Sequence, residues 1–380
     1  MRTITFLNPN KLVFGPQAYA TFREDVKLHG FKRLFIVSIG PMDVTLKVLH
    51  KEFSGAGINC AFDYSIVNEP TFSEFEAILA KAKTFETDCV IGVGGGSVMD
   101  VAKLLAAQLT NSQTLNEVVG IGNLTERSTY LICIPTTSGT GSEVSPNALF
   151  VDHDDNKVGI VSPYLVPDAA YICPEFTVSV PASVTAATGI DALTHCLEAY
   201  ANNFAHPMAD VIAIEGVRLI AENIVAACKD GSDIEARTNM ALGSVYGGMC
   251  LGPVNTGAVH ALAYPLGAIF HVPHGLSNAL LLPYVMEFNL PSAIKQYAAI
   301  GKAVGAVEGA TDEETAKNGI AKIREIIAVC EIPARLSDVG IPEDAIDRMA
   351  AGAIKIQRLL KNNLREVSFE DARAIYRAAY

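Results

Sequence analysis

Residues 90–100 decide the fold of this chain, and their sequence is VIGVGGGSVMD. A short apolar run, 89–93, enters closely spaced glycines, and a helical stretch, 98–109, follows them. Glycines let the backbone adopt positive φ and let a ligand approach closely. The following helix points free N–H groups and the positive end of its dipole at the turn, which favours a phosphate. Ser97 can cap that helix and also donate to a phosphate oxygen.

The glycine turn nearly fits the dinucleotide fingerprint G-x-G-x-x-G. Gly92 and Gly94 occupy the first two places, and Ser97 stands in the third. A tight turn that binds nothing is the alternative interpretation, because a glycine-rich turn alone is weak support for a ligand.

Strands and helices alternate on both sides of this turn. We expect strands at 33–38, 59–67, 89–93 and 130–134, helices at 44–56, 72–85 and 98–109, and a hairpin at 148–162 around the turn residues 153–156. Such alternation is typical of a parallel sheet covered on both faces. After about residue 181 only helical stretches follow, and the last begins near Ser368. The sequence therefore predicts an α/β domain, 1–180, and an all-helical domain, 181–380, packed around a cleft.

A second polar loop, PTTSGTGSE at 135–143, follows the strand at 130–134. Loops after the carboxyl ends of parallel strands line the ligand crevice in such sheets. Thr136, Thr137 and Ser142 are therefore candidate donors to the same ligand, and an ordinary Ser/Thr turn is the alternative.

Composition excludes several classes of protein. The chain has 380 residues, half of them hydrophobic, with a net charge of −12 and no Lys/Arg run, so we expect a globular protein that does not bind nucleic acid. The start carries no extended apolar segment, and the apolar stretch 248–270 contains Asn255, His260 and many glycines, which favours a buried helix plus a loop over a membrane span. The eight cysteines are scattered singly without a C-x-x-C pair, so neither a zinc ribbon nor a redox dithiol is indicated, and we expect small buried residues in a reduced cytoplasm.

Four residues outside the glycine turn predict a metal site. Asp191 and His195 stand one helical turn apart, so their side chains share a face, while His260 and His274 lie in apolar surroundings. Buried carboxylates and imidazoles are costly unless they are paired, and one divalent cation pairs all four. One carboxylate with three imidazoles suits zinc or ferrous iron better than calcium or magnesium. Separately satisfied histidines are the alternative.

Taken together, these motifs resemble the iron-containing (group III) alcohol dehydrogenase family. The matching stretches are GGGSVMDVAK at 94–103, PTTSGTGSE at 135–143, GIDALTH at 189–195, HALAYPLG at 260–267 and PHG at 273–275. The resemblance implies a Rossmann-like nucleotide-binding domain, a helical domain and one catalytic metal, with iron(II) favoured over zinc. It implies that a small alcohol or aldehyde exchanges hydride with NAD or NADP in a cytoplasmic homodimer.

The resemblance also implies roles for individual residues. The implied metal ligands are Asp191, His195, His260 and His274. The implied nucleotide contacts are Gly94, Gly95, Gly96, Ser97, Asp100, Thr136, Thr137, Ser142 and, at the ribose, Lys157. The candidates to pass a proton to solvent are Tyr264 and His271, and for His271 a merely structural role is an equal alternative.

Three positions depart from the family pattern. Many relatives carry a ribose-binding Asp after the first strand, where this chain has Ile39, so NADP stays open as the cofactor. Tyr264 stands where many relatives have a second histidine, which puts a histidine proton relay in doubt, because tyrosine ordinarily titrates near ~10. Leu364 replaces a frequent proline, to which we attach no functional weight.

Other functions fit the sequence less well. A lyase of the dehydroquinate synthase type needs several basic residues for its anionic substrate, and 191–275 contains only Arg218, Lys229 and Arg237. A glycerol dehydrogenase-like or maleylacetate reductase-like enzyme is a nearer alternative. A non-catalytic nucleotide-binding or assembly protein would have lost metal ligands, and all four are present.

Overall fold

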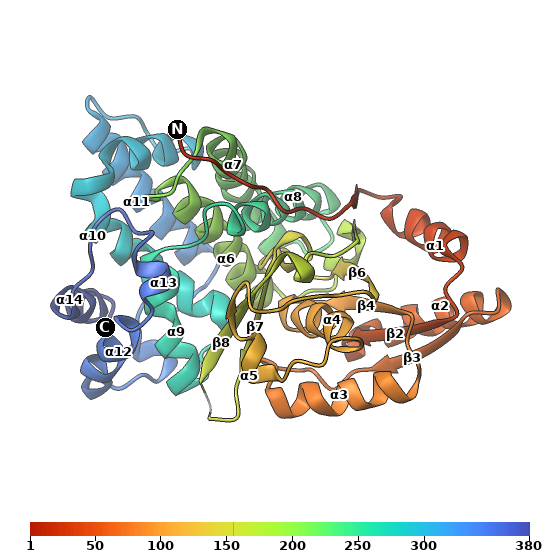
Figure 1. The fold of residues 1–380 in the computed structure, drawn as a ribbon. Coiled ribbons are helices and arrows are strands. Elements are labelled where there is room, and N and C mark those ends of the chain that lie inside the picture. The colour runs from red at the N-terminus through yellow and green to blue at the C-terminus, as the bar shows by residue number, and fades with distance from the viewer. Residues whose placement is uncertain (155) are drawn as a thin grey trace. The chain divides into compact units, whose positions relative to one another are not determined.

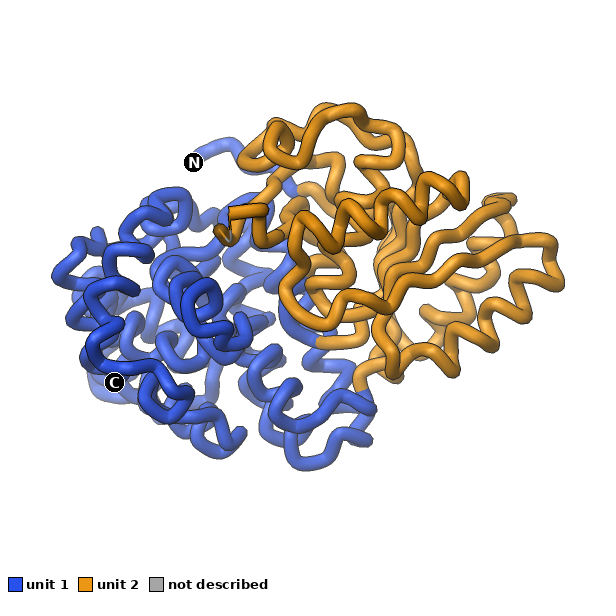
Figure 2. Tube along the Cα trace, turned by 90° about the horizontal axis from the view of Figure 1, so that it is seen from below, with its two compact units in different colours: residues 1–6, 138–141, 178–380 blue, residues 7–137, 142–177 orange. Residues whose placement is uncertain are grey.

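The computed structural model describes residues 1–154 and 156–380. The chain divides into two compact units, coloured separately in Figure 2. Unit 2 comprises 7–137 and 142–177, and unit 1 comprises 1–6, 138–141 and 178–380. Each unit has its own fold.

Unit 2 is built on a six-stranded sheet in the order β1-β9-β6-β4-β2-β3 (Figure 1). All neighbouring strands pair in parallel. The strands are β1 (Lys11–Phe14), β2 (Arg33–Ser38), β3 (Asn59–Asp63), β4 (Cys89–Gly94), β6 (Tyr130–Pro135) and β9 (Ala169–Ile172). The helices of this unit are α1 (Ala18–His29), α2 (Asp43–Gly55), α3 (Phe72–Thr84), α4 (Gly96–Gln108) and α5 (Leu115–Val118). The predicted α/β architecture is thus confirmed.

Helices cover both faces of this sheet, because successive side chains of a strand point to opposite faces. Leu34 and Ile36 of β2 pack in one core with apolar residues of α1 and α2. Phe35 and Val37, their neighbours on the same strand, pack in the other core with apolar residues of α3 and α4. The central strands are therefore buried on both sides and read as continuous apolar runs in the sequence.

The glycine turn joins β4 to α4, as predicted. However, its first glycines are not required for a positive φ. None of its glycines has positive φ. A Cβ on Gly92 would lie 2.9 Å from Cβ of Ala102, and one on Gly94 would lie 2.7 Å from Cβ of Val98. These glycines therefore permit close packing of the helix on its strand. The expectation that Ser97 caps the helix is wrong, because α4 begins at Gly96 with Gly95 as an N-cap that makes no side-chain hydrogen bond.

A second, three-stranded sheet contains the predicted hairpin. Strand β7 (Asn147–Val151) pairs antiparallel with β8 (Lys157–Val161), and β8 pairs with the short β5 (Gly120–Ile121). Of the predicted turn residues, 155 lies outside the described residues.

Unit 1 is helical, and no strand occurs in the described chain after Ile172. Its helices are α6 (Ala182–Tyr200), α7 (Pro207–Lys229), α8 (Ile234–Leu251), α9 (Ala258–Phe270), α10 (His274–Ala303), α11 (Asp312–Val329), α12 (Ile346–Ala353), α13 (Gln357–Leu360) and α14 (Phe369–Ala378). One apolar core runs through these helices, from Ala186 in α6 to Tyr376 in α14. Ser368 caps α14 in a reciprocal capping box with Asp371, close to the predicted start.

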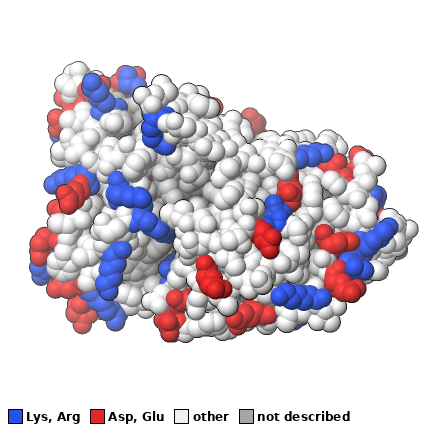
Figure 3. Space-filling view, viewed as in Figure 1, with Lys and Arg blue, Asp and Glu red and all other residues white. Residues whose placement is uncertain are grey.

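The apolar stretch 248–270 forms the end of α8, a loop and α9, as expected. Among the described residues, no helix combines the length and the apolar character that a membrane-spanning segment needs. On the face drawn in Figure 3, basic and acidic side chains are interspersed.

Candidate metal centre and nucleotide loop

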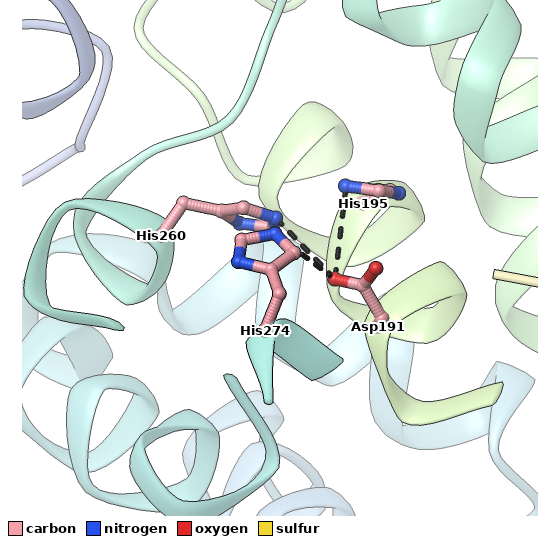
Figure 4. A group of neighbouring side chains, drawn as sticks. All are labelled: Asp191, His195, His260 and His274. Atoms are coloured by element: carbon pink, nitrogen blue, oxygen red, sulfur yellow. Dashed lines mark ion pairs between the residues drawn. The ribbon is translucent and has the colours of Figure 1, made fainter. Parts of the chain in front are cut away.

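Asp191, His195, His260 and His274 converge within unit 1 (Figure 4). Asp191 Oδ1 lies 3.8 Å from Nε2 of His195, 3.6 Å from Nε2 of His260 and 3.7 Å from Nε2 of His274. One ligand atom from each residue lies within 4.8 Å of all the others. Helix α6 supplies the first two residues one turn apart, α9 supplies His260, and α10 begins with His274. The structure thus brings together all four predicted ligands.

Burial and mutual charge set the protonation of this cluster. Burial opposes ionisation of Asp191, but the neighbouring imidazoles, His195 and His274 first, outweigh it and hold the pKa of that carboxyl well below its usual range. Burial lowers the pKa of His195 to about 4. Burial also disfavours the charged form of His260, yet the negative charges of Asp191 and Glu198, the latter in a hydrogen bond to its ring, raise its pKa to about 9. An ionised carboxylate therefore sits among imidazole nitrogens.

Glu198 is a supporting residue that the sequence analysis missed. Its Oε2 lies 2.6 Å from Nδ1 of His260, and its Oε1 accepts a hydrogen bond of 2.6 Å from the backbone N–H of Val259. A carboxylate behind a ligating imidazole fixes its tautomer, and here it leaves Nε2 to face the cluster. The sequence contains an indication of this role, because Glu198 follows His195 by three residues and so shares its helical face.

We expect Glu198→Gln to lower the affinity for a divalent metal by roughly 10- to 100-fold, as is usual when such an outer partner is replaced. The amide keeps the size of the side chain but removes the negative charge behind His260. Competition with a chelator measures the affinity. Glu215→Gln is the control, because Glu215 pairs with Arg218 on α7 outside the cluster. Equal affinity of the Glu198 variant and the wild type would contradict this role.

Asn278 is a second supporting residue. It follows His274 by one turn of α10, is fully buried, and donates from Nδ2 to Asp191 Oδ1 at 2.7 Å. The same nitrogen lies 3.2 Å from Nε2 of His260. The amide therefore helps to orient the carboxylate toward the imidazoles.

The donor set fits a transition metal. Three imidazole nitrogens and one carboxylate oxygen, with a second carboxylate behind one imidazole, match the ligand preferences of iron(II) and zinc. An all-oxygen shell, which calcium and magnesium prefer, is not available from these residues.

The two proton-relay candidates lie differently. Tyr264 follows His260 by one turn of α9, and the centroid of its ring lies 6.2 Å from that of His274. His271 is exposed, adopts φ 55° at the end of α9, and is not a member of the four-residue group. The role of each in proton transfer stays a prediction.

The nucleotide candidates Gly94–Ser97, Thr136 and Thr137 lie in unit 2. A Cβ on Gly95 would meet only Thr137, 3.4 Å from its Oγ1 and 3.7 Å from its Cγ2. The hydroxyl of Thr136 is buried and has no hydrogen-bond partner among the described residues. An orphaned hydroxyl beside an open glycine turn fits a ligand with phosphate oxygens.

Asp100 and Ser142 belong to a buried network with Lys103. Asp100 accepts from Ser142 Oγ at 2.5 Å and from the backbone N–H of Leu149 at 2.9 Å, while Lys103 donates to Ser142 Oγ at 2.9 Å. These contacts fix the polar loop to α4 and β7. Lys157 forms an ion pair with Glu69. Direct contact of Asp100, Ser142 and Lys157 with a nucleotide stays a prediction.

Comparisons with known proteins agree with this geometry. The model "Iron-containing alcohol dehydrogenase" matches residues 9–174, and the model "Fe-containing alcohol dehydrogenase family, C-terminal" matches residues 185–380. Long-chain-alcohol dehydrogenase 1 of Geobacillus thermodenitrificans is 38% identical over 366 residues, which cover 94% of this chain and 91% of that protein. 1,3-Propanediol dehydrogenase of Klebsiella pneumoniae is 33% identical, covering 100% of this chain and 99% of that protein.

A solved structure of 1,3-propanediol oxidoreductase superposes with a TM-score of 0.94 at 33% identity, and the match covers 100% of both chains. These matches span both halves of the chain and favour a dehydrogenase over a lyase of related fold. The chain therefore belongs to the iron-containing alcohol dehydrogenase family and is a metal-dependent, NAD(P)-dependent oxidoreductase of alcohols and aldehydes.

Proposed function

We propose that Asp191, His195, His260 and His274 hold one divalent ion, iron(II) in preference to zinc, at which a small alcohol or aldehyde reacts. The observation that carries this proposal is the convergence of the four donors with Glu198 behind His260. When bound, such an ion supplies Lewis acidity, which makes a hydroxyl group more acidic and polarises a carbonyl group.

Residues around the four ligands position them for this reaction. Glu198 holds the tautomer of His260, and Asn278 orients the carboxylate of Asp191. The apolar helices around the cluster restrict water, which strengthens electrostatic interactions with a reacting oxygen. We propose Tyr264 for proton exchange with solvent, because its ring lies beside that of His274, and His271 is the second candidate.

We assign nucleotide binding to residues 1–180 and metal binding to residues 181–380. Gly95 leaves room for a pyrophosphate at the N-terminus of α4, and the hydroxyl of Thr136 is a donor without a partner in the described structure. A sulfoacetaldehyde reductase from Bifidobacterium kashiwanohense, solved with NAD+, shares this fold at 22% identity and a TM-score of 0.89.

An anaerobic screen tests the proposed reaction. The protein is reconstituted with iron(II) or zinc and assayed with short and long primary alcohols and their aldehydes, using NAD and NADP. We expect metal-dependent turnover that stops on chelation. Turnover that persists after complete metal removal would contradict the proposal.

We further propose a cytoplasmic homodimer. All eight cysteines are free thiols, as expected in a reducing compartment. Strand β1 is an edge of the large sheet and exposes Leu12 and Phe14, so we place the contact with the second copy at this edge. Sedimentation velocity of the wild type and of a Leu12→Lys variant tests the pairing.

Weak discrimination between NAD and NADP is expected, on the order of tenfold or ~1.4 kcal/mol. Ile39 follows the carboxyl end of β2, next to the strand that enters the glycine turn, and carries no charge to repel a 2′-phosphate. Ile39→Asp should therefore shift the ratio of kcat/KM values toward NAD.

The control for that substitution is Ile39→Asn, because Ile39 is half-buried and both variants lose its apolar contacts. Only the aspartate adds a charge. A thousandfold preference in the wild type, or equal shifts in both variants, would mean that another residue reads the ribose.

A further inference from the structure

Arg358 contacts Tyr264, whose ring lies beside the metal ligand His274. Its Nη2 donates a hydrogen bond of 2.7 Å to the hydroxyl of Tyr264, and its guanidinium carbon lies 5.6 Å from the centre of that ring. Tyr264 shares a helical face with His260, and its ring neighbours His274. All four residues belong to unit 1. Tyr264 therefore lies between the guanidinium of Arg358 and the four-residue cluster.

No carboxylate of the described residues forms an ion pair with Arg358. Three other arginines of unit 1 differ in this respect, since Arg218, Arg324 and Arg373 pair with acidic side chains. Arg358 is half-buried and uses one of its five N–H donors on Tyr264. A partly desolvated guanidinium with spare donors is suited to a planar, bidentate anion.

The surrounding sequence is basic although the chain as a whole is acidic. Residues 348–365 contain five basic residues and no acidic one, in a chain of net charge −12. This segment lies outside 191–275, the part whose few basic residues argued against an anionic substrate. Arg365 within it already donates to the backbone of Phe288, and Arg348 lies over the ring of Phe270. Arg358 is the one that reaches a neighbour of the metal ligands.

We propose that Arg358 is a specificity residue that binds a carboxylate carried by the substrate, a few bonds from the reacting carbon. The preferred substrates are then short aldehydes with a terminal carboxylate and the corresponding ω-hydroxy acids. The inference rests on the proposed reaction at the metal site. In that reaction the aldehyde gains a hydride from NAD(P)H and a proton, and the carboxylate is unchanged.

Two aldehydes of equal chain length test this inference with the metal-loaded enzyme. Butyraldehyde is neutral, whereas succinic semialdehyde carries a terminal carboxylate. We expect kcat/KM to favour succinic semialdehyde, and Arg358→Gln to lower this preference by on the order of 10- to 100-fold, mainly through KM. The preference of the wild type should also weaken as ionic strength rises.

Binding without turnover gives a second readout. With NADH or NADPH already bound, 4-hydroxybutyrate cannot react, so calorimetry reports its dissociation constant directly, with 1-butanol as the neutral partner. Arg358→Gln should weaken binding of 4-hydroxybutyrate far more than binding of 1-butanol.

Arg348→Gln is the matched control. It also removes a guanidinium that lies over an aromatic ring of α9, but this one contacts Phe270 instead of Tyr264. Its substrate preference should equal that of the wild type. If the Arg348 and Arg358 variants change the preference equally, or the wild type treats both aldehydes alike, the inference is overturned. If neither aldehyde is reduced by the metal-loaded wild type, the proposed reaction itself fails.

Discussion

We expect His274→Ala to remove the bound metal and to lower turnover of every alcohol by about a thousandfold or more. The ion's Lewis acidity contributes several kcal/mol to stabilising the reacting oxygen, and each ~1.4 kcal/mol changes a rate tenfold. His274 is the ligand whose loss should disturb the fold least. Its side chain is 21% exposed, against 2–5% for the other three ligands, and alanine is well tolerated in the first turn of α10.

Elemental analysis and thermal unfolding of the metal-free proteins test this expectation. The variant should lack metal after reconstitution, while its melting temperature without metal should match that of the metal-free wild type. His153→Ala is the control, because it removes a histidine of the hairpin region that is 48% exposed and outside the cluster. Equal metal content in the His274 variant and the wild type would exclude His274 as a ligand.

The sequence predicted the sheet well because its strands are buried on both faces. Runs such as RLFIVS at 33–38 are short and almost wholly apolar, without the 3.6-residue period of an amphipathic surface helix, and β2 spans those residues as predicted. The start of α4 was less predictable. Gly96 has a low helix propensity, yet it is helical because Gly92 and Gly94 allow α4 to pack closely on β4. Helix propensity alone does not predict such packing.

The metal ligands were predictable, whereas the residues around them were not. Asp191 and His195 reveal themselves by their spacing, and His260 and His274 are histidines in apolar surroundings. Arg358 is separated from Tyr264 by 94 residues, so no local spacing links the two side chains. Glu198 and Asn278 do stand at helical spacing from ligands, and only the distances show that they support them. Long-range partners of a site depend on tertiary packing, which a single sequence does not display.

We expect Gly95→Ala to weaken binding of NADH and NADPH by on the order of 100-fold while leaving the fold and the metal content intact. An added methyl group would occupy the space at the N-terminus of α4 where we place the pyrophosphate. A ligand held there by several charge-assisted hydrogen bonds, each worth ~1.5–3 kcal/mol, would lose at least one of them. The protein itself tolerates the methyl group, because its nearest neighbour is Thr137 Oγ1 at 3.4 Å and the φ of −79° suits alanine.

Gly94→Ala separates this effect from general damage to the turn. Its Cβ would lie 2.7 Å from Cβ of Val98, so this variant should lose thermal stability, whereas Gly95→Ala should keep it. Fluorescence titration with NADH and NADPH gives the dissociation constants, and thermal unfolding gives the stability. Metal content should not change in either folded variant, since the four ligands lie in unit 1 and the glycines in unit 2. Unchanged nucleotide affinity in a stable Gly95→Ala protein would show that the turn serves only to pack α4 on β4.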